Sequence, residues 1–344
     1  MQGTGVKSVT IRDVAREAGV SVGTASRVIN EASNVEPENR VRVRAAIEKL
    51  GFVPNRAAQS MRNGSNREIG IIVRDITIPV LAGFVKAAQS VFDQAGYVLL
   101  ISSAENEKSR ELELLSLLRR RRVDGLIMTT ASQVDAQLAS AREHLGFPVV
   151  LFDRDIANAA DCVLIDHAEG MRQAVSHLLS LGHRRILLVT GDLETYPAQS
   201  RIQGYRQAHQ AAGIPVDEAL IHAGSFEASS AFVETASMLG MTNRPSAVIA
   251  GGIGMLPGVM KAVRAHSLRI PEDISVIGNG DSDLAVLASP AITVIKWDYS
   301  ELGRTSARMI LDRIASRAVP AQRRILFPTE LVIRGSCAAP LADA

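Results

Sequence analysis

The chain has 344 residues, of which 47% are hydrophobic and 22% are charged, and its formal net charge is +2. This length exceeds one compact core, so two or three structural units are expected. No apolar run approaches the ~18 residues of a membrane span, and the polar N-terminus lacks the apolar segment of a secretory signal. We therefore expect a cytoplasmic protein with no membrane partner. Cys162 and Cys337 lie far apart without a C-x-x-C partner, which argues against a disulfide framework or a zinc site.

Positive charge is concentrated near the N-terminus. Residues 1–66 contain ten Lys or Arg and six Asp or Glu, a net charge of +4, which leaves the remainder at −2. A basic first unit before a mildly acidic body is typical of a protein whose first unit binds nucleic acid. An N-terminal domain with ordinary surface charge is the alternative.

Residues 9–30 read VTIRDVAREAGVSVGTASRVIN and predict two short helices joined by a turn. Gly19 can end the first helix and Ser21 can cap the second. Apolar residues follow helical spacing in both halves: Ile11, Val14, Ala15 and Ala18, then Ala25, Val28 and Ile29. Two such helices form a helix-turn-helix. Two core helices of another small domain are the alternative.

The second helix of a helix-turn-helix places its N-terminal residues at base edges in the major groove. Here those residues are Ser21, Val22, Gly23, Thr24 and Arg27. Arg27 can bind guanine O6 and N7 or a phosphate, and Ser21 and Thr24 suit phosphates.

Residues 37–51, PENRVRVRAAIEKLG, predict a third helix with Pro37 in its first turn and Gly51 after its end. We expect its arginines to be solvated or near phosphates. Its packed side is expected to contain Val41, Ala45, Ile47 or Glu48, and Leu50. The segment that follows, FVPNRAAQSMRNGSNRE, is a polar joint whose central residues are too few for a stable isolated helix and could fold on DNA.

From Arg67 onward, nine short apolar runs alternate with helix-length segments. This alternation predicts parallel sheets flanked by helices, and nine strands favour two subdomains. The runs are EIGIIVRD, YVLLISSA, VDGLIMTT, FPVVLFDRD, ADCVLIDH, RRILLVTGD, LIHAGSF, PSAVIAGG and ISVIGNGD. Polar residues after strands are ligand-site candidates, with turn or cap roles as the alternative: Asp75, Asp153, Arg154, Asp281 and Asp283.

Residues 248–263, VIAGGIGMLPGVMKAV, run from a strand through three glycines into a helix, as phosphate-binding loops do. The spacing argues against that role, because Pro257 stands where a dinucleotide fingerprint needs its third glycine and no Gly-Lys-Ser/Thr follows. We expect no cofactor. The arginine run 119–122 is interpreted as a solvated helix end, favoured there by the helix dipole.

These motifs resemble those of the lactose-repressor (LacI/GalR) family of bacterial transcription regulators. TIRDVAREAGVSVGTASRVIN is similar to the family's T-[IL]-x-D-V-A-x-x-A-G-V-S-x-x-T-V-S-R-V-L-N, and LGFVPNRAAQSMR to its L-G-Y-x-P-N-x-x-A-R-S-L-R. DCVLIDHAEGMRQAVSHLLSLGHRRILLVTG, RIQGYRQA, SELGRTSARMIL and TELVIRGSC extend the resemblance through the body to Ser336.

The resemblance implies a transcriptional repressor that binds a pseudo-palindromic double-stranded DNA operator as a homodimer, responds to a small-molecule effector, and is not an enzyme. In the family, paired hinge helices enter the minor groove. Here Ala58 matches the family residue, whereas Gln59 and Met61 replace its Arg and Leu. The implied DNA-binding residues are Thr10, Ser21, Val22, Gly23, Thr24, Ser26, Arg27, Asn30, Asn55, Ala58 and Met61.

The implied fold is an α/β body of two periplasmic-binding-protein-like subdomains after a small all-α helix-turn-helix domain. The helix-turn-helix domain covers 1–54, the hinge helix and linker 55–66, the effector-binding and dimerisation domain 67–338, and a tail 339–344. The N-subdomain is expected at 67–162 plus 292–325 and the C-subdomain at 163–290 plus 326–338, with crossovers near residues 163, 291 and 326. The tail carries no leucine heptad, so the tetramer-forming segment of some relatives is not expected.

The implied effector-binding residues are Asp75, Leu81, Asp153, Arg201, Ile253, Gly280 and Trp297. Arg201 stands at the family's effector-gripping arginine, but several polar family positions have changed. Leu81 replaces an aromatic residue, Gly280 an Asp, and Trp297 a Gln. Ile253 also stands at the Asp of the family's A-N-D motif, and His167 stands where the family has an Asn.

Each hydrogen bond lost from a buried site costs ~1–3 kcal/mol, which argues against the ordinary sugar grip. An anionic or partly apolar effector is favoured, and a carbohydrate held differently or no effector at all are the alternatives. His177 and His183 fall on a structural motif of the family, so no metal is expected.

Two other functions fit parts of the sequence. A solute receptor for a transporter could use the same body, but the DNA-binding unit argues against it. An α/β enzyme could use the glycine stretch with a cofactor, but no nucleophile elbow, metal cluster or acid–base pair accompanies it.

Overall fold

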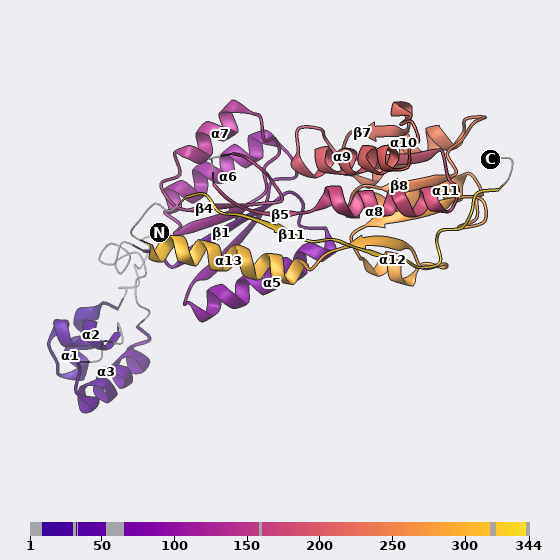
Figure 1. Cartoon of the computed structure of the whole chain (residues 1–344). Helices are drawn as coiled ribbons and strands as arrows, with labels where there is room; N and C mark the ends of the chain where they lie inside the picture. The colour runs from indigo at the N-terminus through magenta and orange to yellow at the C-terminus, as the bar shows by residue number, and fades with distance from the viewer. Residues whose placement is uncertain are drawn as a thin grey trace, which may run out of the picture. The chain divides into compact units, whose positions relative to one another are not determined.

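The computed structural model describes residues 9–29, 32, 34–52, 65–157, 160–316 and 321–341. The chain divides into two compact units, residues 1–66 and 67–344. The described part of the first unit has three helices, α1 (Ile11–Ala18), α2 (Val22–Ile29) and α3 (Pro37–Leu50), shown in Figure 1. Asn30, Asn55, Ala58 and Met61, expected to bind DNA, lie outside the described residues.

The ends of α1 and α2 are set by local hydrogen bonds. Thr10 and Asp13 form a capping box at the start of α1, and Gly19 ends it with a φ of +62°. The Ser21 hydroxyl accepts a hydrogen bond from the Thr24 amide at 3.1 Å at the start of α2. The predicted roles of Gly19 and Ser21 are therefore confirmed. The core of this unit consists of Val14, Ala15, Ala18, Ala25, Val28, Val35, Val43 and Ala46.

The predicted packed side of α3 is wrong in part. Val43 and Ala46 are its buried residues, whereas Val41 is 68% exposed and Ala45 also faces solvent. Ile47 and Leu50 are half-buried against the core, as expected. Apolar residues occur at every second position from 41 to 45, so spacing alone does not choose between the two faces.

The first sheet of the body, within the described ranges, has six parallel strands covered by helices on both faces (Figure 1). Its order is β11 (Arg324–Phe327), β5 (Asp161–Ile165), β4 (Val149–Phe152), β3 (Gly125–Met128), β1 (Glu68–Val73), β2 (Val98–Ser103). Its helices are α5 (Pro79–Gln94), α6 (Lys108–Arg121), α7 (Ala136–Glu143) and α13 (Tyr299–Ala315). Central strands such as β3 are buried throughout because both faces are covered.

The second sheet has the order β12 (Glu330–Val332), β10 (Thr293–Lys296), β9 (Ser275–Asn279), β8 (Ala247–Ala250), β6 (Ile186–Thr190), β7 (Ile221–Ala223). It is parallel except for β12, which pairs antiparallel with β10. Its helices are α8 (His167–Ser180), α9 (Tyr196–Ala211), α10 (Ala228–Leu239), α11 (Leu256–Ala265) and α12 (Asp283–Leu287), with short 3-10 turns η1 (Glu218–Leu220) and η2 (Ile253–Met255). All nine predicted strands are present, as β1 to β9.

The three crossovers between the sheets lie later than predicted. β5 continues in the first sheet to Ile165, and β11 continues there to Phe327. The predicted crossover near residue 291 is wrong by a whole strand, because β10 pairs with β9 and β12 in the second sheet. The chain returns to the first subdomain only after Lys296, and α13 then packs on α5.

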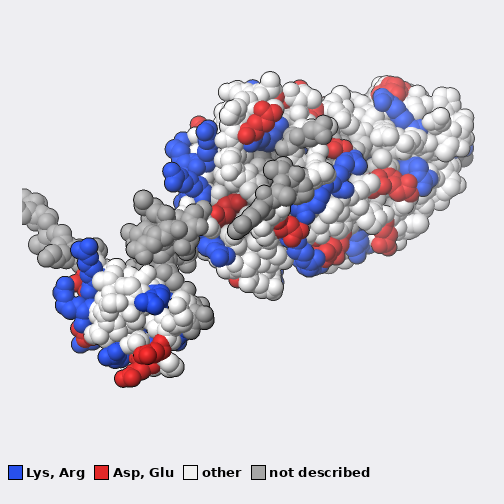
Figure 2. Space-filling view, turned by 60° about the vertical axis from the view of Figure 1, so that its left-hand side comes forward, with Lys and Arg blue, Asp and Glu red and all other residues white. Residues whose placement is uncertain are grey.

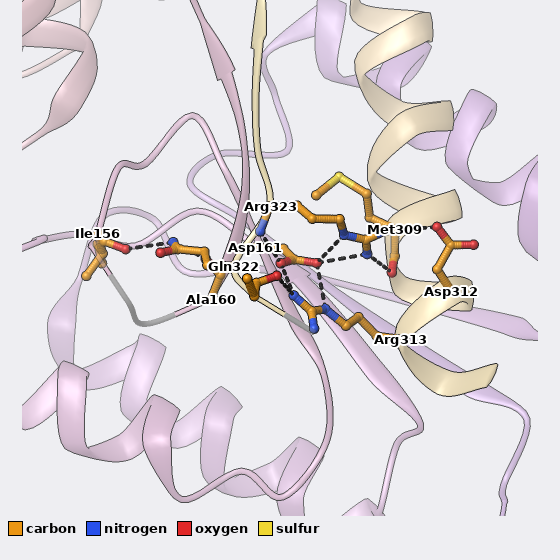
Figure 3. A network of polar contacts seen from close by, with 9 residues as sticks. Ile156, Ala160, Asp161, Met309, Asp312, Arg313, Gln322 and Arg323 are labelled. Atoms are coloured by element: carbon orange, nitrogen blue, oxygen red, sulfur yellow. Dashed lines mark hydrogen bonds and ion pairs between the residues drawn. The ribbon is translucent and has the colours of Figure 1, made fainter. Parts of the chain in front are cut away.

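The buried carboxylate of Asp161 connects the segment before β11 to β5 and α13 of the first subdomain (Figure 3). Asp161, at the start of β5, accepts from Arg313 Nε of α13 at 2.8 Å and from the Arg323 amide before β11 at 2.8 Å. Arg323 Nη2 also donates to Asp161 at 2.8 Å and to the carbonyl of Met309 at 2.8 Å. The single carboxylate therefore joins three segments that are far apart in sequence.

No helix in the described ranges is long and apolar enough to cross a bilayer.

Candidate functional site: a DNA-reading helix and an interdomain cavity

The first candidate site is the solvent side of α2. Ala25 and Val28 face the core, so the opposite side presents Val22, Gly23 and Arg27. Val22 is 44% exposed, although it is apolar and lies at the helix N-terminus. The Arg27 side chain is exposed and donates from Nε to the Gly23 carbonyl at 3.3 Å, so it lies along the helix toward its N-terminal end. The residues exposed on this side of α2 are those expected from the sequence to contact base edges.

Hydroxyl groups flank this surface. The Ser21 and Thr24 hydroxyls are 2.9 Å apart, and Ser26 is half-buried on the next turn. Thr10, at the start of α1, binds Asp13 through its hydroxyl at 2.7 Å. The structure thus places Ser21, Thr24 and Ser26 on or beside α2, while Thr10 acts in the capping box of α1.

The second candidate site is a cavity of about 90 Å³ between the two subdomains of the body. Its walls come from the carboxyl ends of the strands in both sheets, where ligands of open α/β sheets bind. The first subdomain contributes Arg74, Ile78, Leu81, Thr129, Phe152, Asp153, Arg154 and Ile165. The second contributes Pro197, Arg201, Phe226, Gly252 and Ile253, and the segment after β10 contributes Trp297 and Tyr299.

The charges at this cavity are unbalanced. Arg74, Arg154 and Arg201 line it, whereas Asp153 is the only acidic residue that lines it among those the structure describes. Burial lowers the pKa values of Arg154 and Arg201 to about 10, and it also lowers the pKa of Arg74. All three guanidinium groups nevertheless stay charged at neutral pH. The cavity therefore carries an excess of positive charge in a poorly solvated place.

Arg201 is held by a buried polar chain that crosses the cleft. Asp153 accepts from His167 Nε2 at 3.0 Å, and His167 Nδ1 lies 3.3 Å from Arg201 Nη2. With its amide oxygen turned to Arg201, Asn279 accepts from Nε at 2.7 Å and from Nη2 at 2.8 Å. Arg201 Nη1 is buried and has no hydrogen-bond partner among the described residues. This leaves a fixed, unsatisfied donor beside the cavity.

Phe226 lines this cavity and also a larger outer one of about 500 Å³. Two guanidinium groups lie over its ring, with Arg74 Cζ at 5.2 Å and Arg201 Cζ at 5.5 Å from the ring centre. Gly252 makes room for the ring, because a Cβ atom there would lie 2.8 Å from Phe226 Cδ1. The glycine stretch therefore leaves space for an aromatic side chain beside the cavity.

The expected effector residues fall into two groups. Five of them line the cavity together: Leu81, Asp153, Arg201, Ile253 and Trp297. Asp75 instead lines the outer cavity, where its carboxylate accepts from the Thr77 amide at 2.8 Å in a turn. Gly280 lies behind Ile253, whose Cδ1 would be 2.6 Å from a Cβ atom at that position.

The strand-end candidates Asp281 and Asp283 also line the outer cavity. Asp281 forms an ion pair with Arg334 at 2.8 Å.

Several residues at this site were not predicted from the sequence. Arg74 directly follows β1 and Asn279 ends β9, so the strand-end rule could have found both. Tyr299, at the start of α13, lies two residues after Trp297. Phe226 sits in the segment between β7 and α10, and no sequence pattern marks it.

His177 and His183, for which no metal role was expected, are packed within the second subdomain. His183 is buried, with Nδ1 2.8 Å from the Ser246 hydroxyl and Nε2 2.9 Å from the Ala338 carbonyl. His177 is half-buried on α8, where burial lowers its pKa. Among the described residues, no group of three or more His, Cys, Asp or Glu side chains could hold a metal ion.

Comparisons with known proteins agree with this arrangement. The family description "Bacterial regulatory proteins, lacI family" matches residues 10–55, and "Periplasmic binding protein-like domain" matches residues 175–337. The chain is 33% identical over 336 residues to the HTH-type transcriptional repressor PurR of Erwinia tasmaniensis, covering 97% of this chain and 98% of that protein. It is 31% identical over 330 residues to the HTH-type transcriptional regulator DegA of Bacillus subtilis, covering 95% and 97%.

Solved structures are similar over the same length. The lac repressor dimer bound to operator and the anti-inducer ONPF has a TM-score of 0.83 and 31% identity, covering 97% of this chain and all of that chain. The transcriptional regulator CelR in complex with cellobiose has a TM-score of 0.71 and 30% identity, covering 95% and 99%.

A helix-turn-helix unit followed by a two-subdomain body with a cavity between its sheets defines a ligand-responsive, DNA-binding transcription regulator. The chain belongs to the LacI family of bacterial regulatory proteins. The relatives named above are transcription regulators rather than enzymes.

Proposed function

We propose that the protein is a homodimeric repressor of a pseudo-palindromic operator and that a small anionic effector with an apolar body controls its affinity for DNA. The observation that carries the effector class is Arg201, whose Nη1 is buried and has no partner among the described residues, beside a cavity where Arg74 and Arg154 add further positive charge. Unsatisfied buried donors and excess buried charge are both costly, and an anion in the cavity would relieve both.

The other side chains that line the cavity indicate what further chemical groups the ligand has. Guanidinium groups bind carboxylates and phosphates through paired hydrogen bonds. Phe152, Trp297 and Ile253 line the same cavity and would contact apolar or aromatic parts of a ligand. A compact aromatic or branched carboxylate combines these features, as does an aromatic phosphate.

A neutral sugar is the alternative, since cellobiose occupies the related regulator CelR. A neutral ligand would leave the excess positive charge of the cavity uncompensated, which is why an anion is favoured here.

Matched pairs of small molecules test the effector class by thermal unfolding of the full chain. Benzoate and benzamide differ in charge but hardly in shape, and phenyl phosphate and phenyl glucoside compare an anion with a sugar. We expect the anions to raise the melting temperature, because a ligand at 100 times its Kd stabilises the fold by about 2.7 kcal/mol.

The Arg201→Ala variant is the control, and it should lose this response. If benzamide or neutral sugars stabilise the protein as well as the anions do, the proposed effector class is wrong.

The DNA-binding role rests on α2 and is tested by Arg27→Ala. A base-reading arginine contributes roughly 1–3 kcal/mol of discrimination, so the variant should bind its operator more weakly and distinguish base changes less well. The measurement is the ratio of affinities for the operator and for scrambled DNA.

Arg44→Ala provides the matched control, because Arg44 is exposed on α3 of the same unit. Its loss should leave that ratio unchanged, even if overall affinity falls. An unchanged ratio for Arg27→Ala would contradict the assignment of α2 as the reading helix.

A further inference from the structure

The last turn of α6 and the residue after it carry four consecutive arginines, Arg119, Arg120, Arg121 and Arg122, here called the α6 arginine cluster. All four side chains are exposed. Figure 2 shows Lys and Arg side chains gathered at one end of the body. Successive helix residues point about 100° apart, so the cluster covers the helix end rather than one stripe of it.

This cluster lies at the edge of the body where the chain enters β1. The strands of the first sheet are parallel, so their N-terminal ends share one edge. Arg121 pairs with Glu68 at 2.8 Å, and Glu68 is the first residue of β1. The Asp124 amide donates to the Glu68 carbonyl at 2.8 Å, which places the end of α6 at that same edge.

Stabilisation of the C-terminal end of α6 is not enough to explain why four arginines occur there. The interaction of a cationic side chain with the helix dipole contributes about 0.3–1 kcal/mol, acts only within the last turn and is screened by salt. Arg121 takes the neighbouring carboxylate of Glu68. Arg120 donates to the Ser116 hydroxyl at 2.6 Å, and neither Arg119 nor Arg120 forms an ion pair within the described ranges. By contrast, Arg313 and Arg323, which lie near the start of β5, both form ion pairs with buried Asp161, and Arg323 also pairs with Asp312.

We infer that the α6 arginine cluster binds the phosphate backbone of double-stranded DNA flanking the operator. This inference rests on the proposed operator-binding function. The fifteen Cα–Cα steps from Phe52 to Arg67 span at most about 50 Å when fully extended, which keeps the cluster within reach of DNA held by α2. Exposed, flexible arginines contact phosphates without reading sequence, so the contact adds affinity and salt dependence rather than specificity.

The test compares two duplexes with the full-length protein. One carries an operator, selected from random DNA by the protein itself, and ends at its borders. The other extends the same operator by about 10 bp, one helical turn, on each side. The test variant is Arg119→Ala/Arg120→Ala, and Arg119→Gln/Arg120→Gln serves as a second variant if the first unfolds.

Lys108→Ala/Arg110→Ala is the matched control. It removes the same charge from the same helix, but at the opposite end, where both side chains are 45% exposed.

Each phosphate contact contributes about 0.9 to the slope of log K against log salt. Two lost arginines should therefore reduce that slope by up to about 1.8 per protomer on the extended duplex only. Between about 50 and 200 mM salt, this slope change alters the ratio of wild-type to variant affinity by about tenfold per protomer, or about 100-fold for a dimer. The control variant should match the wild type on both duplexes.

Equal slopes and affinities for wild type and test variant on the extended duplex would overturn the inference. An equal loss on both duplexes would also overturn it, because the contact would then not lie in flanking DNA. If the wild type selected no operator at all, the proposed function itself would fail, and that result is distinct from the other two.

Discussion

At the scale of single residues, the shape and charge of the cavity between the subdomains depend on how Arg201 is held. Burial lowers the pKa of His167, so its ring is neutral at pH 7. The ring lies between Asp153 and Arg201 and orients the Arg201 side chain without adding a charge. Asp153 itself has a φ of +54°, a conformation that costs a residue with a side chain of order 1 kcal/mol. Such strain at a residue that lines a cavity is consistent with a functional constraint on the direction of its carboxylate.

Gly280 supports the cavity wall from behind, and Gly280→Ala should show it. This residue has a φ of +95°, and a Cβ atom would lie 2.6 Å from Ile253 Cδ1. The left-handed conformation alone costs an alanine roughly 1–2 kcal/mol. Overpacking against Ile253 should add roughly 1–3 kcal/mol and weaken ligand binding. Urea unfolding and the thermal response to benzoate measure the two effects.

Gly213→Ala separates strain from overpacking. Gly213 has a φ of +65°, and a Cβ atom there would have no heavy atom of the described residues within 4 Å. In this variant, only the backbone strain should lower the free energy of unfolding, and ligand binding should be unchanged. Equal losses for the two variants would contradict the role of Gly280 in shaping the wall.

At the scale of helices and strands, predictability follows burial. β1 to β9 could be predicted because strands covered on both faces must be apolar throughout. The packed face of α3 could not, since Val41 and Val43 are equally apolar and only the tertiary contacts with α1 and α2 select Val43. The second crossover could not be placed either, because an apolar strand such as β10 reads alike in either sheet.

Asp161 should contribute strongly to the attachment of β11, and Asp161→Asn tests this. The change removes the charge that pairs with Arg313 and Arg323. We expect a loss on the order of 2 kcal/mol, below the full cost of breaking a buried pair because the arginines keep some solvent contact. Asp312→Asn is the control: its pair with Arg323 is exposed and should contribute at most about 1 kcal/mol.

The same carboxylate predicts a pH dependence. Burial would raise the pKa of Asp161, but hydrogen bonds from Arg313 and Arg323 outweigh it and hold the pKa below its ordinary value. Its stabilisation is therefore complete above about pH 4, the ordinary range of an aspartate, and is lost as the pH falls through the lower folded-state value. Unfolding free energies of wild type and Asp161→Asn should converge in acid, and a constant difference would contradict this account.

At the scale of the whole molecule, the division into a DNA-binding unit and a ligand-binding body could be read from charge and periodicity. The lining of the cavity could be read only in part. Asp153 and Arg154 follow a predicted strand, but Phe226 reaches the cavity from a segment without a pattern, and the partnership of Arg201 with Asn279 joins residues far apart in sequence. Such contacts depend on how two subdomains meet, which local sequence does not encode.

An anion bound beside Arg201 should change the affinity of the protein for its operator. The most direct measurement is an operator titration of wild type and Arg201→Ala, with and without the anion that stabilises the wild type most. We expect the Kd of the wild type to change by about 5- to 150-fold, the range of 1–3 kcal/mol typical of coupled sites. Arg201→Ala should bind operator normally and show no change. An unaltered Kd for the wild type at saturating anion, or an equal shift in Arg201→Ala, would contradict the account.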